Sequence, residues 1–266
     1  MSHRRLIRAF ALALGLSVLL PGAAVTAAEE PAGSAVRDLL PDMKMAKLYG
    51  LDLETRPSGA VRLHFGTIGW NMGEGPLEAR GSREGATETA MRVTQRIYNS
   101  AGGFRDRVSP AVMTYTGDGH DHWHVRQFML LNMYKRGQPG GSVYGLRKLG
   151  YCLLDARRRA NEPPNTPPSA VYLGNSCGVQ SSLSVRMGLS VGYGDDYPPY
   201  FAHQWMDVTG LVAGVYRICA TVDPLGDFRE MSETNNQRWT DVRIDPAMDE
   251  VAALATGVGA CGPSVP

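Results

Sequence analysis

Residues 60–65 read AVRLHF, so the apolar side chains of Val61, Leu63 and Phe65 alternate with less apolar neighbours. Successive side chains of a β-strand point to opposite faces, so this alternation predicts a strand with one buried face. The 31 glycines and 17 prolines among 266 residues favour turns and short strands over long helices. We therefore expect a mainly β fold, with a β-sandwich core, long loops and few short helices.

Segments of similar character lie on both sides of this stretch. We expect strands at residues 45–53, 60–70, 74–80, 120–134, 143–155, 204–208, 215–222 and 237–244. Residues 90–101 fit either a helix or a strand followed by a loop, and residues 29–40 fit a polar, helical lead-in. Residues 156–170 form a proline-rich loop with an arginine cluster. Long loops on a β scaffold are often functional.

The first 28 residues have the three parts of a secretory signal peptide: a basic start, an apolar run at 9–20 and small residues at 25–28. We expect cleavage near Ala27 or Ala28, a secreted protein and a single domain over residues 29–266. The pair Arg4-Arg5 fits both a twin-arginine and a general secretory signal, and the export route stays open. No later apolar stretch approaches the ~20 residues that span a bilayer, so we expect no membrane span.

The 27 basic and 26 acidic residues nearly balance, but three of the arginines lie in the signal. Removing them leaves 24 basic residues against 26 acidic ones, a net charge of −2. This composition disfavours a strongly basic nucleic-acid-binding protein. Only four basic residues are lysines, namely Lys44, Lys47, Lys135 and Lys148. A specific role for a lysine can therefore belong to only a few residues.

All four cysteines, Cys152, Cys177, Cys219 and Cys261, follow the signal. An even number of cysteines in an exported chain predicts two disulfides, with three pairings open. Their spacing matches neither a zinc ribbon nor a CxxC redox motif.

Residues 119–125 read GHDHWHV and hold three histidines at alternate positions, His120, His122 and His124. Alternate residues of a strand share a face, so the three imidazoles can meet one metal ion. Imidazole suits copper, zinc, iron and nickel. Three nitrogen ligands leave an open coordination position, which favours a catalytic metal site over a structural one.

HDHWH at residues 120–124, followed by Phe128, resembles the copper-binding strand of the lysyl oxidase family. Further stretches resemble family segments in the same order, at residues 61–77, 148–155, 189–209, 214–216 and 230–236. The resemblance extends over residues 41–244, most of the chain after the signal.

Lysyl oxidases oxidise a primary amine to an aldehyde and release ammonia and hydrogen peroxide. The resemblance implies a secreted, copper-dependent oxidase of the protein-lysine 6-oxidase type. Its substrates would be lysine side chains of peptides or proteins, or small primary amines, with molecular oxygen. The resemblance also implies copper ligands at His120, His122 and His124, and a lysine tyrosylquinone made from Lys148 and Tyr197. The lysine must be uncharged to add to a tyrosine-derived quinone.

The reaction needs a base that removes a proton from the α-carbon of the substrate amine, and a carboxylate suits this step. Asp121, Asp195 and Asp196 lie near the implied site in sequence, and the choice among them stays open. Vertebrate members of the family carry acidic residues just after the third histidine. This chain has Arg126 and Gln127 there.

The resemblance implies a disulfide between Cys152 and Cys177. It also sets Cys261 at the position of the family's C-terminal cysteine, whose usual partner position lies near Thr240. We expect Cys219, on the neighbouring strand, to be its partner here.

The resemblance further implies a calcium ion, held by Asp42, the carbonyl of Met43, Glu230, Asn235 and Asn236. Oxygen ligands of this mixture suit calcium. A family aspartate is replaced by a serine in this segment, which lowers the negative charge. The alternative is that residues 234–236 only shape a turn between strands.

Two other functions compete with the oxidase. One is a non-catalytic copper-binding β-sandwich that has lost the quinone. The other is a secreted binding module whose histidines hold a structural zinc. The presence of both Lys148 and Tyr197 favours the oxidase.

Overall fold

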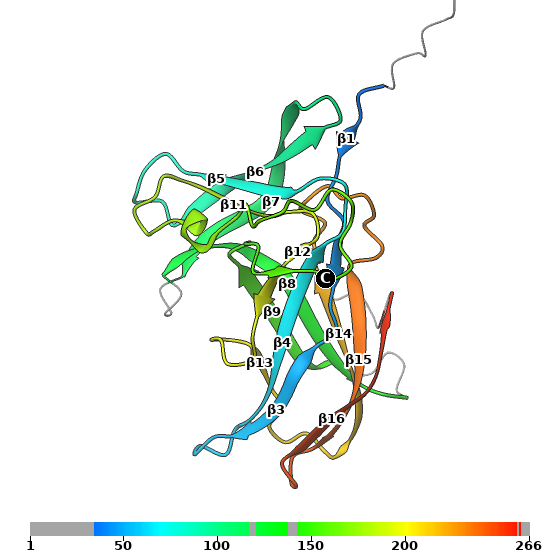
Figure 1. Cartoon of the computed structure of the whole chain (residues 1–266). Helices are drawn as coiled ribbons and strands as arrows, with labels where there is room; N and C mark the ends of the chain where they lie inside the picture. Colours follow the sequence, from blue (N-terminus) through cyan, green and yellow to red (C-terminus); the bar gives the residue numbers. More distant parts are fainter. Residues whose placement is uncertain (1–34, 117–120, 138–142, 260, 262–266) are drawn as a thin grey trace, which may run out of the picture. The chain divides into compact units, whose positions relative to one another are not determined.

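The computed structural model describes residues 35–116, 121–137, 143–259 and 261, apart from the side chains of residues 143–148. The part of the chain from Val36 onward is one unit of two antiparallel β-sheets (Figure 1). The predicted signal peptide lies outside the described residues.

The larger sheet has ten strands among the described residues. Eight of them follow one another in the order β11 (Ser184–Leu189), β5 (Leu77–Ser82), β6 (Ala90–Asn99), β7 (Phe104–Thr116), β8 (His122–Lys135), β14 (Gly214–Val222), β15 (Gln237–Asp245) and β16 (Glu250–Val258). The other two, β1 (Asp38–Leu39) and β9 (Val143–Tyr151), pair with β6 and β8.

The smaller sheet has six described strands and is built around β4 (Val61–Asn71). Its order is β10 (Arg157–Arg158), β12 (Tyr193–Tyr197), β4 and β13 (Trp205–Asp207), while β2 (Met43–Met45) and β3 (Tyr49–Thr55) also pair with β4. One 3₁₀ helix, η1 (Gly174–Cys177), is present in the described part. No described helix is long and apolar enough to cross a membrane.

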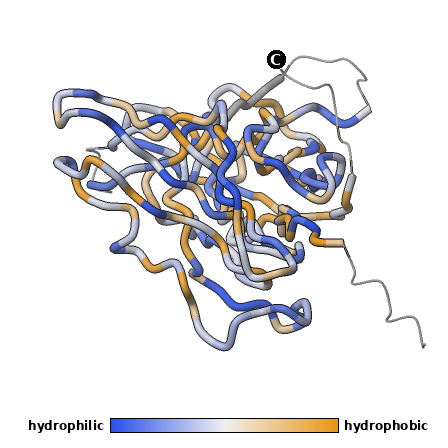
Figure 2. The backbone as a smooth tube through the Cα atoms, turned by 90° about the horizontal axis from the view of Figure 1, so that it is seen from above, coloured by the Kyte–Doolittle hydropathy of each residue, from blue (hydrophilic) through white to orange (hydrophobic). Residues whose placement is uncertain are grey.

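The core lies between strands of both sheets. Leu63 and Phe65 of β4 are fully buried, and so are Met129 and Leu131 of β8. Short hydrophobic and hydrophilic stretches are interspersed along the backbone (Figure 2). The alternation at residues 60–65 therefore gives β4 its buried face.

The mainly β prediction is confirmed. Residues 90–101 adopt the strand alternative, as β6. The helical lead-in is wrong for its described part, because Asp38 and Leu39 pair with Asn99 and Tyr98 of β6. β7, β11, β12 and β16 were not expected from the sequence pattern.

Two disulfides join Cys152 to Cys177 and Cys219 to Cys261, the predicted pairing. Arginine makes most of the ion pairs among the described residues. Examples are Arg96 with Asp106 and Arg217 with Asp241.

Candidate metal and active site

β8 begins at His122, and strand geometry gives His122 and His124 the same face. Their ring centroids lie 4.5 Å apart. Trp123 between them donates from Nε1 to the carbonyl of Val179 at 2.9 Å. His120 lies outside the described residues. Two of the three predicted metal ligands are therefore seen side by side.

Thr116, at the end of β7, pairs across the strands with His122. Its Oγ1 donates to the carbonyl oxygen of His122 at 3.3 Å and lies 3.0 Å from Nδ1 of His124. A hydroxyl that donates to this carbonyl is available to accept a proton from Nδ1 of His124. In that tautomer Nε2 carries the ring's lone pair, as a metal-binding imidazole requires.

A cavity of about 650 Å³ adjoins His122. Its lining includes Cys152 just after β9, Asp195 and Tyr197 of β12, and Phe201 after β12. One predicted metal ligand and the predicted quinone tyrosine thus face the same space.

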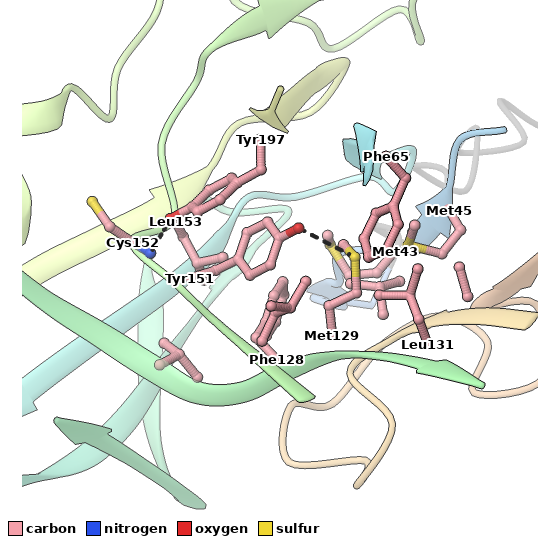
Figure 3. Packing of buried hydrophobic residues seen from close by; sticks show 14 of the residues in the cluster. Met43, Met45, Phe65, Phe128, Met129, Leu131, Tyr151, Cys152, Leu153 and Tyr197 are labelled. Carbon is pink, nitrogen blue, oxygen red and sulfur yellow. Dashed lines mark hydrogen bonds between the residues drawn. The ribbon is translucent and has the colours of Figure 1, made fainter. Parts of the chain in front are cut away.

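Tyr197 is held firmly in this wall. Its hydroxyl accepts the backbone N–H of Cys152 at 3.0 Å, and its ring lies 3.9 Å from that of Tyr151. Tyr151 in turn donates to the sulfur of Met129 (Figure 3). Burial and then the charge of Asp195 raise the pKa of Tyr197 well above its ordinary value. The phenol is therefore uncharged at neutral pH.

The three aspartates considered as bases have different surroundings. Asp195 is buried, and its Oδ2 has no hydrogen-bond partner among the described residues. Burial, followed by the charges of Asp196 and Asp155, raises the pKa of Asp195 well above its ordinary value. Asp196 instead accepts hydrogen bonds from Arg157 and the hydroxyl of Tyr49.

Asp121 is exposed and has a φ of 40° just before β8. Asp195 and Asp196 line the cavity, whereas Asp121 is not among its lining residues. Only Asp195 combines access to the cavity with an oxygen that no described group occupies.

Lys148 belongs to β9, where its backbone pairs with Leu130 of β8. Its side chain is outside the described part of the structure. Cys152, four residues further along the chain and just after β9, donates its N–H to the hydroxyl of Tyr197. The pairing of Lys148 with Tyr197 stays a prediction.

A second group of oxygen-bearing side chains joins β2 to the segment before β15. Asn235 Nδ2 donates to Asp42 Oδ1 at 2.9 Å, and Asn236 Nδ2 donates to Glu230 Oε1 at 2.9 Å. Met43 contributes its N–H, which donates to Glu230 Oε2. The side-chain oxygens of Asn235 and Asn236 have no partner among the described residues. All five residues of the predicted calcium site thus lie in one cluster.

Two further carboxylates belong to this cluster. Oxygens of Asp223, Glu230 and Glu233 lie within 4.8 Å of one another. Burial raises the pKa of Glu230 to about 9 and that of Asp223 to about 6. Carboxyls that burial makes hard to ionise become favourable ligands once a cation supplies the missing charge.

The family model described as Lysyl oxidase matches residues 79–253, more than half of the chain. The chain belongs to the lysyl oxidase family. Membership indicates a lysyl oxidase-like function, that of an amine oxidase. No curated protein matches the chain significantly.

The lysyl oxidase match contains the described histidines of β8, Asp195 and Tyr197, while Asp42 precedes it. The donor set fits the copper ion that the family implies. It has two imidazoles with ring centroids 4.5 Å apart, and a hydroxyl lies 3.0 Å from Nδ1 of one of them, as in the outer shell of metal-bound histidines.

Three residues of these sites were not expected from the sequence of this family member, namely Thr116, Asp223 and Glu233. Thr116 lies on a strand that the pattern did not indicate. Asp223 could be noticed only as part of the Asp-Pro break after residue 222. Glu233 lies within segment 230–236, which resembles the family, but the resemblance implies ligands only at its neighbours Glu230, Asn235 and Asn236.

Proposed function

We propose that this protein is a secreted copper amine oxidase that converts primary amines, above all lysine side chains of peptides or proteins, to aldehydes. Molecular oxygen would be the oxidant, and ammonia and hydrogen peroxide the other products. One observation carries the proposal: His122, Asp195 and Tyr197 line one cavity of about 650 Å³.

His122 and His124, with His120, would hold the copper ion. Thr116 supports this role, because its hydroxyl orients the ring of His124 from the side away from Nε2. Copper would assist in building the lysine tyrosylquinone from Lys148 and Tyr197. The strand that carries Lys148 ends at Tyr151, and the N–H of the next residue, Cys152, donates to the hydroxyl of Tyr197. This supports pairing the two residues.

The quinone, when present, supplies an electrophilic carbonyl carbon for the nitrogen of the substrate amine. Asp195 would accept a proton from the α-carbon of the amine, on the oxygen that no described group occupies. A buried carboxyl with a raised pKa is a stronger base than an exposed one, which suits this role. Asp196, fixed by Arg157 and Tyr49, would instead contribute negative charge that attracts the substrate ammonium.

A secreted location is supported by the two disulfides, which persist in oxidising compartments. The predicted signal peptide at residues 1–28 agrees with it.

Mass spectrometry of copper-loaded protein tests the quinone. The expected result is a cross-link between the peptides that carry Lys148 and Tyr197, labelled by phenylhydrazine. Lys148→Ala should abolish peroxide release from lysine peptides while copper stays bound. Lys47→Ala, at an exposed lysine, should leave both unchanged. A folded, copper-loaded protein with both residues unmodified would refute the oxidase and favour a non-catalytic copper- or zinc-binding β-sandwich.

We also propose that the cluster around Glu230 binds calcium. Asp42, Asn235 and Asn236 would contribute oxygens, as would the Met43 carbonyl. Asp223 and Glu233 would make up for the family aspartate that Ser232 replaces. The amide oxygens of Asn235 and Asn236, which have no hydrogen-bond partner in the described part of the chain, support this role. Calorimetric titration with calcium tests it, and the absence of binding at millimolar calcium would refute it.

A further inference from the structure

A second cavity, of about 660 Å³, lies on the larger sheet at β5, β6 and β11. Arg80, Arg96 and Arg186 come from these three strands and line it. We call this cavity the arginine groove.

The register of the strands brings two of these positive charges face to face. Arg186 of β11 lies directly opposite Arg80 of β5. Like charges in directly opposed positions destabilise a sheet. A protein that keeps such a pair must compensate for it, either with its own acidic groups or with a ligand.

Glu78 provides part of this compensation. It is fully buried and accepts a hydrogen bond from Arg80 at 2.7 Å and one from Arg186 at 3.0 Å. Burial raises its pKa, but hydrogen bonds from Tyr172, Arg80, Arg186 and Tyr98 outweigh that effect and hold the pKa below its ordinary value. Glu78 is therefore ionised at neutral pH.

The charges of the groove do not cancel. Arg96 is neutralised by Asp106, with two hydrogen bonds of 2.8 Å. Arg80 and Arg186 share the single carboxylate of Glu78. Among the described lining residues and Glu78, three guanidiniums therefore face two carboxylates, and one positive charge is left over.

The rest of the lining is rich in hydrogen-bond donors. Four serines and one threonine contribute hydroxyls to it. Arg80 and Arg186 remain partly exposed, with 37% and 49% of their side-chain surface accessible. A concave surface with surplus positive charge, accessible guanidiniums and several hydroxyls is complementary to carboxylates.

A disulfide joins the wall of the groove to the wall of the cavity that adjoins His122, which we call the active-site cavity. Cys152 lines the active-site cavity, and its disulfide partner Cys177 lies between Ser176 and Gly178, which line the groove. The Cα atoms of the two cysteines are 5.8 Å apart.

A second connection runs through Asp155. Its neighbours Leu154 and Ala156 line the active-site cavity. Its carboxylate accepts the N–H groups of Val171 and Tyr172, at 2.8 Å and 3.2 Å, and these two residues line the groove. These two links make the groove and the active-site cavity neighbours.

We propose that the arginine groove binds the acidic side chains of a polypeptide whose lysine enters the neighbouring active-site cavity. The proposal rests on the proposed amine oxidase function and names its substrate class: lysine-containing polypeptides with acidic residues at a distance from the lysine. Carboxylates of the substrate would supply the counter-charge that Arg80 and Arg186 lack.

Binding is tested without catalysis. The probe is a fluorescent peptide of Glu, Gly and Ser, acetylated at its N-terminus and free of lysine, so that it has no primary amine. We expect it to bind at least about tenfold more tightly than the same peptide with Gln for Glu, and more weakly as salt increases. Equal binding of the two peptides would overturn the proposal. So would competition by acetate or sulfate at the same carboxylate-equivalent concentration, which would indicate a small-anion site.

Substitution of Arg80 or Arg186 would remove one of the two guanidiniums that neutralise the buried carboxylate of Glu78 and would disturb the fold, so the test uses Ser184. This residue is exposed on β11 and lines the groove. Ser184→Glu adds a negative charge and should weaken binding of the acidic peptide about tenfold or more. Ser184→Gln is the matched neutral control and should bind within about twofold of the wild type. An acidic peptide that binds both variants equally would contradict the proposal.

Kinetics separates this inference from the proposed function. With a lysine peptide that carries distant glutamates, Ser184→Glu should raise KM about tenfold and leave kcat unchanged. Its oxidation of a small primary amine should not change. If the protein binds the acidic probe but oxidises no amine, the amine oxidase function is refuted and acidic binding in the groove is supported. If it oxidises lysine peptides equally with and without distant glutamates, acidic binding in the groove is refuted and the amine oxidase function is supported.

Discussion

Asp155 offers a sharp test of how the walls of the two cavities are held. Its buried carboxylate accepts four hydrogen bonds: Ser190 N and Oγ at 2.7 Å each, Val171 N at 2.8 Å and Tyr172 N at 3.2 Å. These bonds join the end of β9 to segments that lie 16 to 35 residues further along the chain. Asp155→Asn keeps the shape of the side chain but replaces one acceptor oxygen with an NH₂ donor.

The loss of stability in Asp155→Asn follows from the number of hydrogen bonds that each carboxylate oxygen accepts. Oδ2 receives three of the bonds and Oδ1 receives one. The asparagine carbonyl would take the Oδ2 position, and the NH₂ would then face the N–H of Ser190. One buried donor without a partner costs about 1–3 kcal/mol, and the other bonds lose the strengthening that a charge provides. We expect the free energy of unfolding to fall by about 3 kcal/mol, within a factor of two.

The assay is guanidinium unfolding with the disulfides intact, followed by tryptophan fluorescence. Asp207→Asn is the control, because Asp207 is exposed and accepts the N–H of Thr209 at 2.8 Å. It should stay within about 0.5 kcal/mol of the wild type. A similarly small change in the free energy of unfolding for Asp155→Asn would refute the reasoning that this carboxylate holds the walls of the two cavities together.

Three further predictions concern the disulfide and the two metal sites. Replacing Cys152 and Cys177 together with serine should lower the stability by about 3 kcal/mol, since the bridge closes a loop with a sequence separation of 25; an unchanged denaturation midpoint would contradict this. Thr116→Val should weaken copper binding about 10–100-fold in competition with a chelator, and unchanged affinity would argue against its role in orienting the imidazole. Burial raises the pKa of Glu230 to about 9, so its carboxyl is protonated at pH 7 without metal and calcium must displace the proton. Calcium affinity should therefore rise about tenfold per pH unit toward pH 9 and become less dependent on pH in Glu230→Gln, whereas pH-independent binding to the wild type would count against this assignment.

The sequence predicted those parts of the fold whose pattern is local. β4 was predictable because Val61, Leu63 and Phe65 alternate with less apolar residues on a half-buried strand. β7 was missed because its first half is charged and exposed, which hides the alternation of its second half. β12 was missed because Gly194 and two aspartates disfavour strands, and only pairing with β4 makes them one.

The predicted active-site residues rest mainly on the family resemblance, since a lone tyrosine such as Tyr197 has no local signature. The choice among the aspartates needed the structure, because Asp195 and Asp196 are neighbours whose opposite surroundings come from distant segments. The same holds for the arginine groove. Arg80 and Arg186 are far apart in the chain, and only the register of β5 and β11 brings them together.

The preference for arginine in the ion pairs has a consequence for an enzyme with the proposed activity. A guanidinium is not a primary amine and cannot be oxidised to an aldehyde as a lysine can. Of the described lysines, Lys44 has its ammonium 2.9 Å from Asp42, and only 42% of its side-chain surface is accessible. A chain with 4 lysines among its 27 basic residues offers few targets to neighbouring copies of itself. Purified at high concentration with copper and oxygen, such a protein should resist self-oxidation and the cross-linking that aldehydes cause.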